Sequence, residues 1–160
     1  MDLTPFHDLR LFDRLPSRAR NALAGIMVER QWKTGDVVIT QGTHSDGVYI
    51  LLEGQIKVTR ITNSGPSVIL NTFQPGAVFG TLSSMDGGLR GANCIAQTDV
   101  KIAFLSRADF LELMSGSSPL SLGFQVVVVR SIFADIRRTN EELAELSSLL
   151  PITPDVIEEE

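Results

Sequence analysis

One segment of the chain combines glycines, small polar side chains and a single cation: "FGTLSSMDGGLRGAN", residues 79–93. Glycine lets a backbone approach a ligand closely, and the N–H groups at the start of a helix carry partial positive charge. Arginine forms charge-assisted hydrogen bonds with phosphate oxygens. The residue types therefore predict a site for one small anion, with Arg90 as its cation. The alternative is a flexible hairpin with a solvated arginine, because glycine-rich turns are common.

The other reactive side chains do not assemble a catalytic site. His7 belongs to an N-terminal segment and His44 to a hairpin loop, so neither a histidine-activated nucleophile nor a metal site has its parts. Asp46 and Asp86 are typical turn residues. Cys94 precedes an isoleucine, which favours a buried strand position over a reactive thiol. We expect no enzyme, no metal site and no cofactor.

Composition and charge limit the class of protein. With 160 residues and 43% hydrophobic content, the chain is long enough for one ordinary core. Its formal net charge is -5, and no lysine or arginine follows Arg138. Because DNA-binding surfaces need clustered basic residues, we expect no contact with DNA. No run looks long and apolar enough to span a bilayer, and the N-terminus has acids where a signal peptide is basic. These features indicate a cytoplasmic protein with no membrane contact.

Two sections of the chain must position the glycine-rich loop. Residues 5–27 have helical spacing, with Pro16 at a plausible first helical position. Residues 28–105 alternate short β-branched and aromatic runs with turn residues at short intervals. This rhythm predicts a mainly β fold with flanking helices, an antiparallel β-roll that resembles a jelly roll.

Helical spacing returns over residues 106–148. Ser106 with Asp109 three residues later is a capping signature for a helix start. The sequence thus predicts one domain over residues 1–148. An acidic tail follows at residues 149–160, and we expect it to be flexible.

A long helix is expected from about Leu120 to Ser148. Its apolar positions recur at alternating steps of three and four, the seam of a coiled coil. The valines at 126–129 favour packing on the β-domain, whereas the later part, flanked by glutamates, favours pairing with a second chain. The alternative is a helix that only covers its own core. We expect a homodimer whose seam contains Val129, Ile132, Ile136, Leu143 and Leu146.

The segment "GDVVITQGTHSDGVYILLEGQIKV" resembles cyclic nucleotide-binding domains of the catabolite activator and protein kinase A regulatory type. The continuation "VILNTFQPGAVFG" resembles the family's next hairpin. The similarity covers about Leu9 to Leu146, and it implies a β-roll with cAMP or cGMP as the ligand. The matching positions are Gly35, Gly42, Asp46, Tyr49, Ile50, Gly54, Ile56, Gly76, Phe79 and Gly80.

In this family the glycine-rich loop is a phosphate-binding cassette, and the resemblance implies which residues bind the ligand. Arg90 takes the place of the arginine that contacts the phosphate, and the long helix supplies a pair of polar residues that meet the base. The implied ligand-binding residues are Gly80, Thr81, Leu82, Ser83, Arg90, Gly91, Ala92, Asn93, Thr139 and Asn140.

Thr81 departs from the family pattern. Members that bind cyclic nucleotides tightly have a glutamate here, which accepts a hydrogen bond from the ribose 2′-hydroxyl. Threonine is shorter and neutral, so its bond is weaker or passes through water. Losing a charge-assisted bond costs about 1.5 to 3 kcal/mol, or roughly ten- to a hundredfold in affinity.

Two functions therefore stay open. In the first, a cyclic nucleotide enters the roll, orders the loop around Arg90 and shifts the long helix, which changes a dimer or a surface for a protein effector. In the second, the fold is a dimerisation or docking module that needs no ligand. Because Arg90 is placed on a loop, we expect Arg90→Ala to leave the fold intact.

Overall fold

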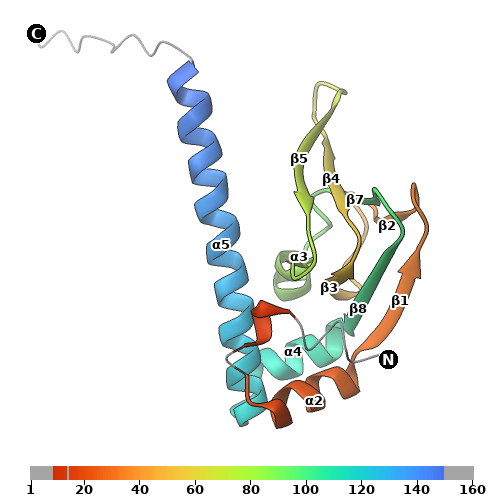
Figure 1. Cartoon of the computed structure of the whole chain (residues 1–160). Coiled ribbons are helices and arrows are strands. Elements are labelled where there is room, and N and C mark those ends of the chain that lie inside the picture. The colour runs from red at the N-terminus through yellow and green to blue at the C-terminus, as the bar shows by residue number, and fades with distance from the viewer. Residues whose placement is uncertain (1–8, 14, 150–160) are drawn as a thin grey trace, which may run out of the picture.

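Two four-stranded antiparallel sheets form the body of the protein (Figure 1). The structure is a computed structural model and describes residues 9–13 and 15–149. The first sheet has the strand order β1-β8-β3-β6, and the second has the order β2-β7-β4-β5. The strands are β1 (Val28–Trp32), β2 (Val37–Ile39), β3 (Gly47–Glu53), β4 (Ile56–Ile61), β5 (Ser67–Phe73), β6 (Val78–Phe79), β7 (Asn93–Ala96) and β8 (Val100–Ser106).

The first sheet has an apolar core on each of its faces. One core lies between the two sheets and includes Tyr49, Phe79 and Phe104. The other lies between the first sheet and the helices and includes Val48 and Ile50. This explains the unbroken apolar run of β3, because a strand covered on both faces has no position for an exposed polar side chain. The predicted fold class, an antiparallel β-roll with flanking helices, is confirmed.

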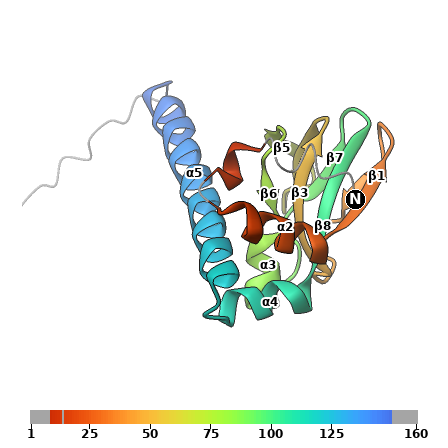
Figure 2. The ribbon, with the colours of Figure 1, turned by 60° about the horizontal axis from the view of Figure 1, so that its bottom comes forward.

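Helices close the roll at one end (Figure 2). The short 3-10 helix η1 and α2 precede the roll, and α3 interrupts it between β6 and β7. The last two helices follow β8, and Ser106 caps the first of them by accepting a hydrogen bond from the backbone N–H of Asp109, as the capping signature predicts. The bounds are η1 (Arg10–Phe12), α2 (Ser17–Ile26), α3 (Thr81–Asp86), α4 (Arg107–Ser115) and α5 (Pro119–Leu149).

The first part of α5 packs on the domain and the rest stands beside the roll (Figure 1). Phe124, Val127 and Val128 are buried, while Val126 and Val129 are about half exposed, so only the middle pair of valines faces the core. The Gln125 amide nitrogen donates to the carbonyls of Leu113, Met114 and Gly116, and this ties α5 to the end of α4. From Thr139 to Leu149 every side chain is exposed.

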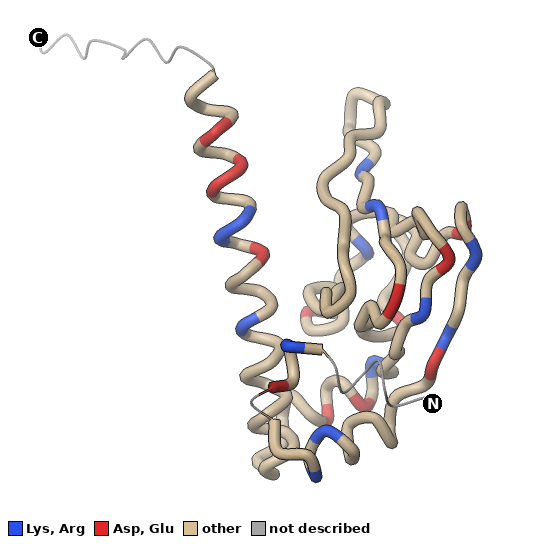
Figure 3. The backbone as a smooth tube through the Cα atoms, viewed as in Figure 1, with Lys and Arg blue, Asp and Glu red and all other residues tan. Residues whose placement is uncertain are grey.

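The positions of the predicted seam on α5 are not equivalent. Ile132 packs against the core beside the helices. Val129, Ile136, Leu143 and Leu146 are exposed, and so is Phe133, which the prediction omitted. Ile132 is only partly buried against that core, and its place in the seam stays a prediction, because α5 has apolar residues on two faces and a heptad stripe can be drawn along either. Acidic and basic residues alternate along the middle of the helix, whereas the charged residues from Thr139 to Leu149 are all acidic (Figure 3).

By length and composition, α5 could also cross a membrane. The expectation that no run is long and apolar enough for this was therefore wrong. Core helices of soluble proteins can be equally long and apolar. In α5, 22% of the most apolar 18-residue stretch is buried inside this domain.

Candidate functional site

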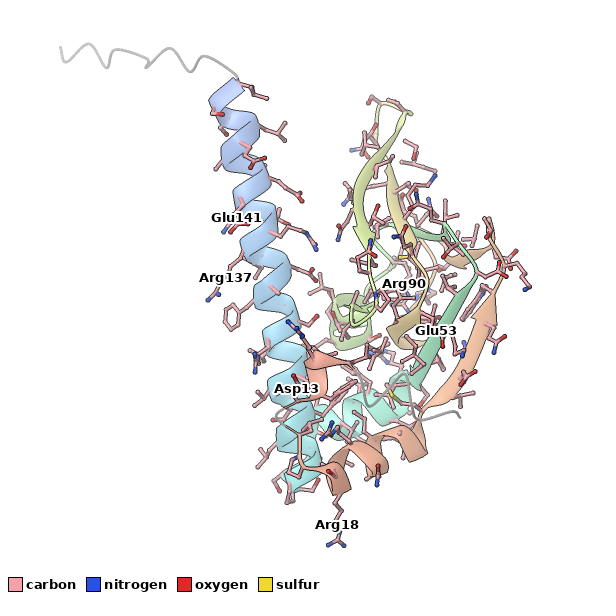
Figure 4. All side chains as sticks on the ribbon, viewed as in Figure 1. Asp13, Arg18, Glu53, Arg90, Arg137 and Glu141 are labelled. Carbon is pink, nitrogen blue, oxygen red and sulfur yellow. The ribbon has the colours of Figure 1, made fainter. Side chains whose placement is uncertain are left out.

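Arg90, labelled in Figure 4, is buried, and both of its terminal nitrogens donate hydrogen bonds within the protein. Its Nη1 donates to the carbonyl of Gly80 at 2.8 Å and to the hydroxyl of Ser83 at 2.9 Å. Its Nη2 donates to Asp46 Oδ1 at 2.8 Å and to the carbonyl of Gly47 at 2.7 Å. These four bonds use every N–H of the two terminal nitrogens. Arg90 lies on a loop between α3 and β7, as expected, but the expectation that it lies outside the core was wrong, because only 4% of the residue is exposed.

Asp46 is the counter-charge of Arg90. The Tyr49 hydroxyl also donates to this carboxylate, at 2.7 Å from Oδ2, and Arg30 Nη1 lies 3.6 Å from the same oxygen. Burial would raise the pKa of Asp46, but the hydrogen bonds from Tyr49 and Arg90 outweigh it and hold the pKa below its usual value. Burial and the bond to Asp46 raise the pKa of Tyr49. Asp46 is therefore ionised and Tyr49 neutral at neutral pH.

Gly80 shapes the entrance to α3. Its φ is +79°, in the left-handed region that favours glycine. A Cβ at Gly80 would lie 2.5 Å from Arg90 Nη1, so a larger residue would displace the guanidinium. Gly91, by contrast, has open space around its Cβ position and is exposed. The backbone at Gly91, just after Arg90, is therefore open to a ligand.

Two further contacts fix the cassette, which we define as residues 80–92. Ser84 Oγ lies 2.9 Å from the carbonyl of Gly47 and 2.7 Å from that of Gly80. Arg107, the first residue of α4, donates from Nε to the carbonyl of Ser84 at 3.0 Å. The cassette is therefore hydrogen-bonded both to β3 and to α4, the helix that precedes α5.

The remaining predicted residues of the cassette lie around Arg90. Thr81 and Ser83 are buried at the start of α3, whereas Leu82 is 72% exposed. Ala92 packs against the core between the sheets. The side-chain oxygen of Asn93 accepts a hydrogen bond from the backbone N–H of Gln41, so this atom holds the β2–β3 connection.

Thr139 and Asn140 are not brought to the cassette. Both are exposed on the far half of α5. Within the described part of the chain, neither makes a hydrogen bond to residues 80–92. Their role in ligand binding stays a prediction, and it requires that α5 move or that a second chain supply them.

Sequence reasoning missed the role of Asp46, which it read as a turn residue. The contact spans 44 positions in the chain, so no local pattern reveals it. The available signal was the place of Asp46 in the family motif. Cys94 was predicted correctly as a buried strand residue, and burial raises the pKa of its thiol to about 12.

A cavity of about 830 Å³ lies between α5, η1 and the β5–β6 turn, and Arg90 does not line it. It is lined by Arg10, Arg130 and Arg138, with Asp135 as the only carboxylate among its wall residues. Among the described residues, no three His, Cys, Asp or Glu side chains lie close enough to hold a metal ion. The cassette is therefore the candidate site because of its chemistry and not its volume.

Comparisons with known proteins agree with this geometry. Residues 29–117 match the family model of the cyclic nucleotide-binding domain. The chain is 32% identical over 105 residues to a cAMP-dependent protein kinase regulatory subunit of Dictyostelium discoideum, covering 65% of this chain and 32% of that protein. It is 26% identical over 136 residues to a CRP-like cAMP-activated global transcriptional regulator of Mycobacterium tuberculosis, covering 85% and 59%. The chain thus spans less than two thirds of either relative.

Solved structures show the same architecture. The catabolite activator protein of Thermus thermophilus superposes with a TM-score of 0.69 at 25% identity, covering 86% of this chain and 62% of that one. The residues matched by the family model, 29–117, include the cassette and Arg90. The chain belongs to the family of cyclic nucleotide-binding domains.

Proposed function

We propose that the protein is a regulatory module that binds a cyclic nucleotide, cAMP or cGMP, in its β-roll. The phosphate would lie against the cassette, where Arg90 and backbone N–H groups near Gly91 and Ala92 supply the positive charge. The observation that carries the proposal is the buried Arg90, whose position is fixed by four hydrogen bonds. A cation with a fixed position binds an anion with little further loss of conformational entropy.

The output would pass through the helices that follow the roll. Arg107 joins the cassette to α4, and Gln125 joins the end of α4 to α5. A ligand that moves α3 would therefore act on the start of α4, and through the contacts at the end of α4 it could change the angle of α5. The exposed apolar residues of α5 would then pair with a second copy, as proposed for the homodimer.

The alternative is a module that dimerises or docks without a ligand. Two observations favour it: Thr81 replaces the family glutamate, and all terminal N–H groups of Arg90 already have partners within the protein. In this case Arg90 is a structural residue that holds α3 on β3. That the module does not act on DNA stays a prediction, since one relative is a transcriptional regulator.

Thermal melts with and without ligand test the proposal. We expect cAMP or cGMP at millimolar concentration to raise the Tm, while the open-chain 5′-AMP and 5′-GMP leave it unchanged, because only the cyclic ester fits the cassette. Equal shifts with cyclic and open-chain nucleotides, or no shift with either, would favour the ligand-independent module.

A further inference from the structure

Three arginines line the cavity between α5, η1 and the β5–β6 turn. Arg10 comes from η1, which lies beside α5 (Figure 1), and Arg130 and Arg138 lie about two helical turns apart on α5 itself. These three guanidinium groups share the wall with a single carboxylate, that of Asp135. No residue of the cassette lines this cavity, so it is separate from the site proposed for the cyclic phosphate.

The positive charges of this wall are not balanced by the protein. Arg138 Nη2 donates to Asp135 Oδ1 at 2.9 Å, and its Nε lies 3.7 Å from Glu142 Oε1. Arg10 and Arg130 are exposed, and neither forms a side-chain hydrogen bond or an ion pair with the described part of the chain. A concave wall with charges of one sign concentrates the electric field and attracts a ligand of the opposite sign. The cavity therefore favours an anion.

The floor of the cavity is apolar. Leu9, Leu52 and Val78 line it, and all three are buried members of the core between the first sheet and the helices. Phe73 also lines it and is partly buried against the core between the sheets. The volume, about 830 Å³, is within the range of roughly 300–1,000 Å³ that is typical of small-molecule sites. An apolar floor beneath exposed cations fits a ligand that has both an apolar body and an anionic group.

The wall near Asp135 is partly shielded from water. Burial raises the pKa of the Asp135 carboxyl, and the charge and hydrogen bond of Arg138 only partly offset this effect. Charges interact more strongly where water is partly excluded than they do on an open surface. An anion at this wall is therefore attracted more strongly than one beside solvated surface arginines.

We propose that this cavity binds an amphiphilic anion, a molecule with an apolar chain and one carboxylate or phosphate group. The anionic group would contact Arg10 and Arg130, because a guanidinium can donate two parallel hydrogen bonds to either kind of group. The apolar chain would cover Leu52 and Val78. Since η1, α5 and the β5–β6 turn all contribute to the wall, such a ligand would connect α5 to the rest of the domain. The inference does not depend on the binding of a cyclic nucleotide.

Calorimetric titration of the wild-type protein with octanoate, octyl phosphate, 1-octanol and inorganic phosphate tests this inference, with each amphiphile below the concentration at which it forms micelles. We expect octanoate or octyl phosphate to bind at one site per chain, and the tighter of the two identifies the preferred anionic group. The neutral octanol should bind at least about tenfold more weakly, because it lacks the charge-assisted bonds, and inorganic phosphate should bind more weakly still, because it lacks the chain. No binding of either anionic amphiphile, or equal affinity for octanol, would overturn the inference.

Variants at exposed positions assign the binding to this cavity. The double variant Arg10→Gln with Arg130→Gln removes both unpaired cations and should weaken binding of the anionic amphiphile at least about tenfold. Ala134→Trp places a large side chain in the cavity from an exposed wall position, so it should block binding while the Tm without ligand stays unchanged.

Arg137→Gln is the matched control for the cavity. Arg137 lies on the same helix, is outside the cavity wall and points away from the roll (Figure 4), so the affinity should stay at the wild-type value. Wild-type affinity in the double variant or in Ala134→Trp would overturn the inference. A loss in Arg137→Gln as large as that in the double variant would also overturn it, because the attraction would then follow net charge and not the cavity.

Discussion

The cassette and the far half of α5 are stabilised in different ways. In residues 80–92, the guanidinium of Arg90, the hydroxyl of Ser84 and the left-handed turn at Gly80 hold one another through bonds to β3. In α5, every side chain from Thr139 to Leu149 is exposed, including Leu143 and Leu146. The protein's own fold therefore determines the geometry of the cassette, whereas the rest of the domain does not cover the distal half of α5.

The largest effect is expected for the assembly of α5. Replacing both Ile136 and Leu143 by Glu would place two charges in the proposed seam, at a cost of several kcal/mol if they are buried between chains. We expect light scattering to show monomers, with an unchanged Tm for the monomer because both residues are exposed in the single chain.

Arg137→Glu is the matched control for assembly, because it also lowers the net charge by two and its side chain points away from the roll (Figure 4). It should leave the assembly intact. Wild-type protein that is already monomeric at micromolar concentration would show that α5 is only a cover for its own domain.

Arg90→Ala tests the opposite region. The substitution leaves Asp46 and the carbonyls of Gly47 and Gly80 without their donor, and we expect the free energy of unfolding to fall by about 3 kcal/mol. The sequence alone predicts an intact fold for this variant, without the hydrogen bonds that the buried guanidinium makes. Urea denaturation measures the effect.

Arg30→Ala removes the other arginine beside Asp46 and serves as the control. Its side chain is 39% exposed, lies 3.6 Å from the carboxylate and covers the Phe104 ring, so the loss should be about 1 kcal/mol. Equal losses in the two variants would show that Arg90 contributes no more than a surface ion pair.

Thr81→Glu restores the acceptor that the family uses for the ribose hydroxyl. We expect cyclic nucleotides to bind more tightly by about 1 to 3 kcal/mol, the contribution of one charge-assisted bond. Thr81 is 8% exposed, so the longer side chain must displace its neighbours, and the gain should lie at the lower end of this range. Weaker binding by the variant would indicate a pocket reshaped around the threonine.

The smallest effect is the acid dependence of Asp46. Its pKa is lower in the folded than in the unfolded state, so its contribution to stability is present above the unfolded pKa and is lost as pH falls through the folded value. Asp46→Asn should be less stable than wild type by about 1 kcal/mol at pH 7, because the carboxylate is half exposed. Below about pH 4 the difference should close. If the two proteins still differ in stability at pH 3, the charge of Asp46 is not the cause, and a contact of the uncharged side chain is.

Local patterns predicted the elements well. The change from helical spacing to short β-branched runs near Val28 coincides with the start of β1, and the cap at Ser106 marks the start of α4. Buried Cys94 and the extent of α5 also followed from neighbouring residues. These features depend on interactions within a few positions of the chain.

Long-range features could not be read from the sequence in the same way. The Asp46–Arg90 pair and the meeting of Arg10 with Arg130 at one cavity arise from the tertiary fold, which brings together residues from distant parts of the chain. The outward position of Phe133 depends on which face of α5 the domain covers. No periodicity distinguishes the two apolar faces of that helix.

The binding of a cyclic phosphate at Arg90 is tested most directly by calorimetric dissociation constants for wild type, Arg90→Lys and Arg30→Lys with cGMP and cAMP in the same salt. Lysine keeps the charge but cannot reproduce the four bonds of the guanidinium. We predict one nucleotide bound per wild-type chain, affinity at least about tenfold weaker for Arg90→Lys, and wild-type affinity for Arg30→Lys. No binding by folded wild-type protein, or equal affinity for all three proteins, would contradict this role of Arg90.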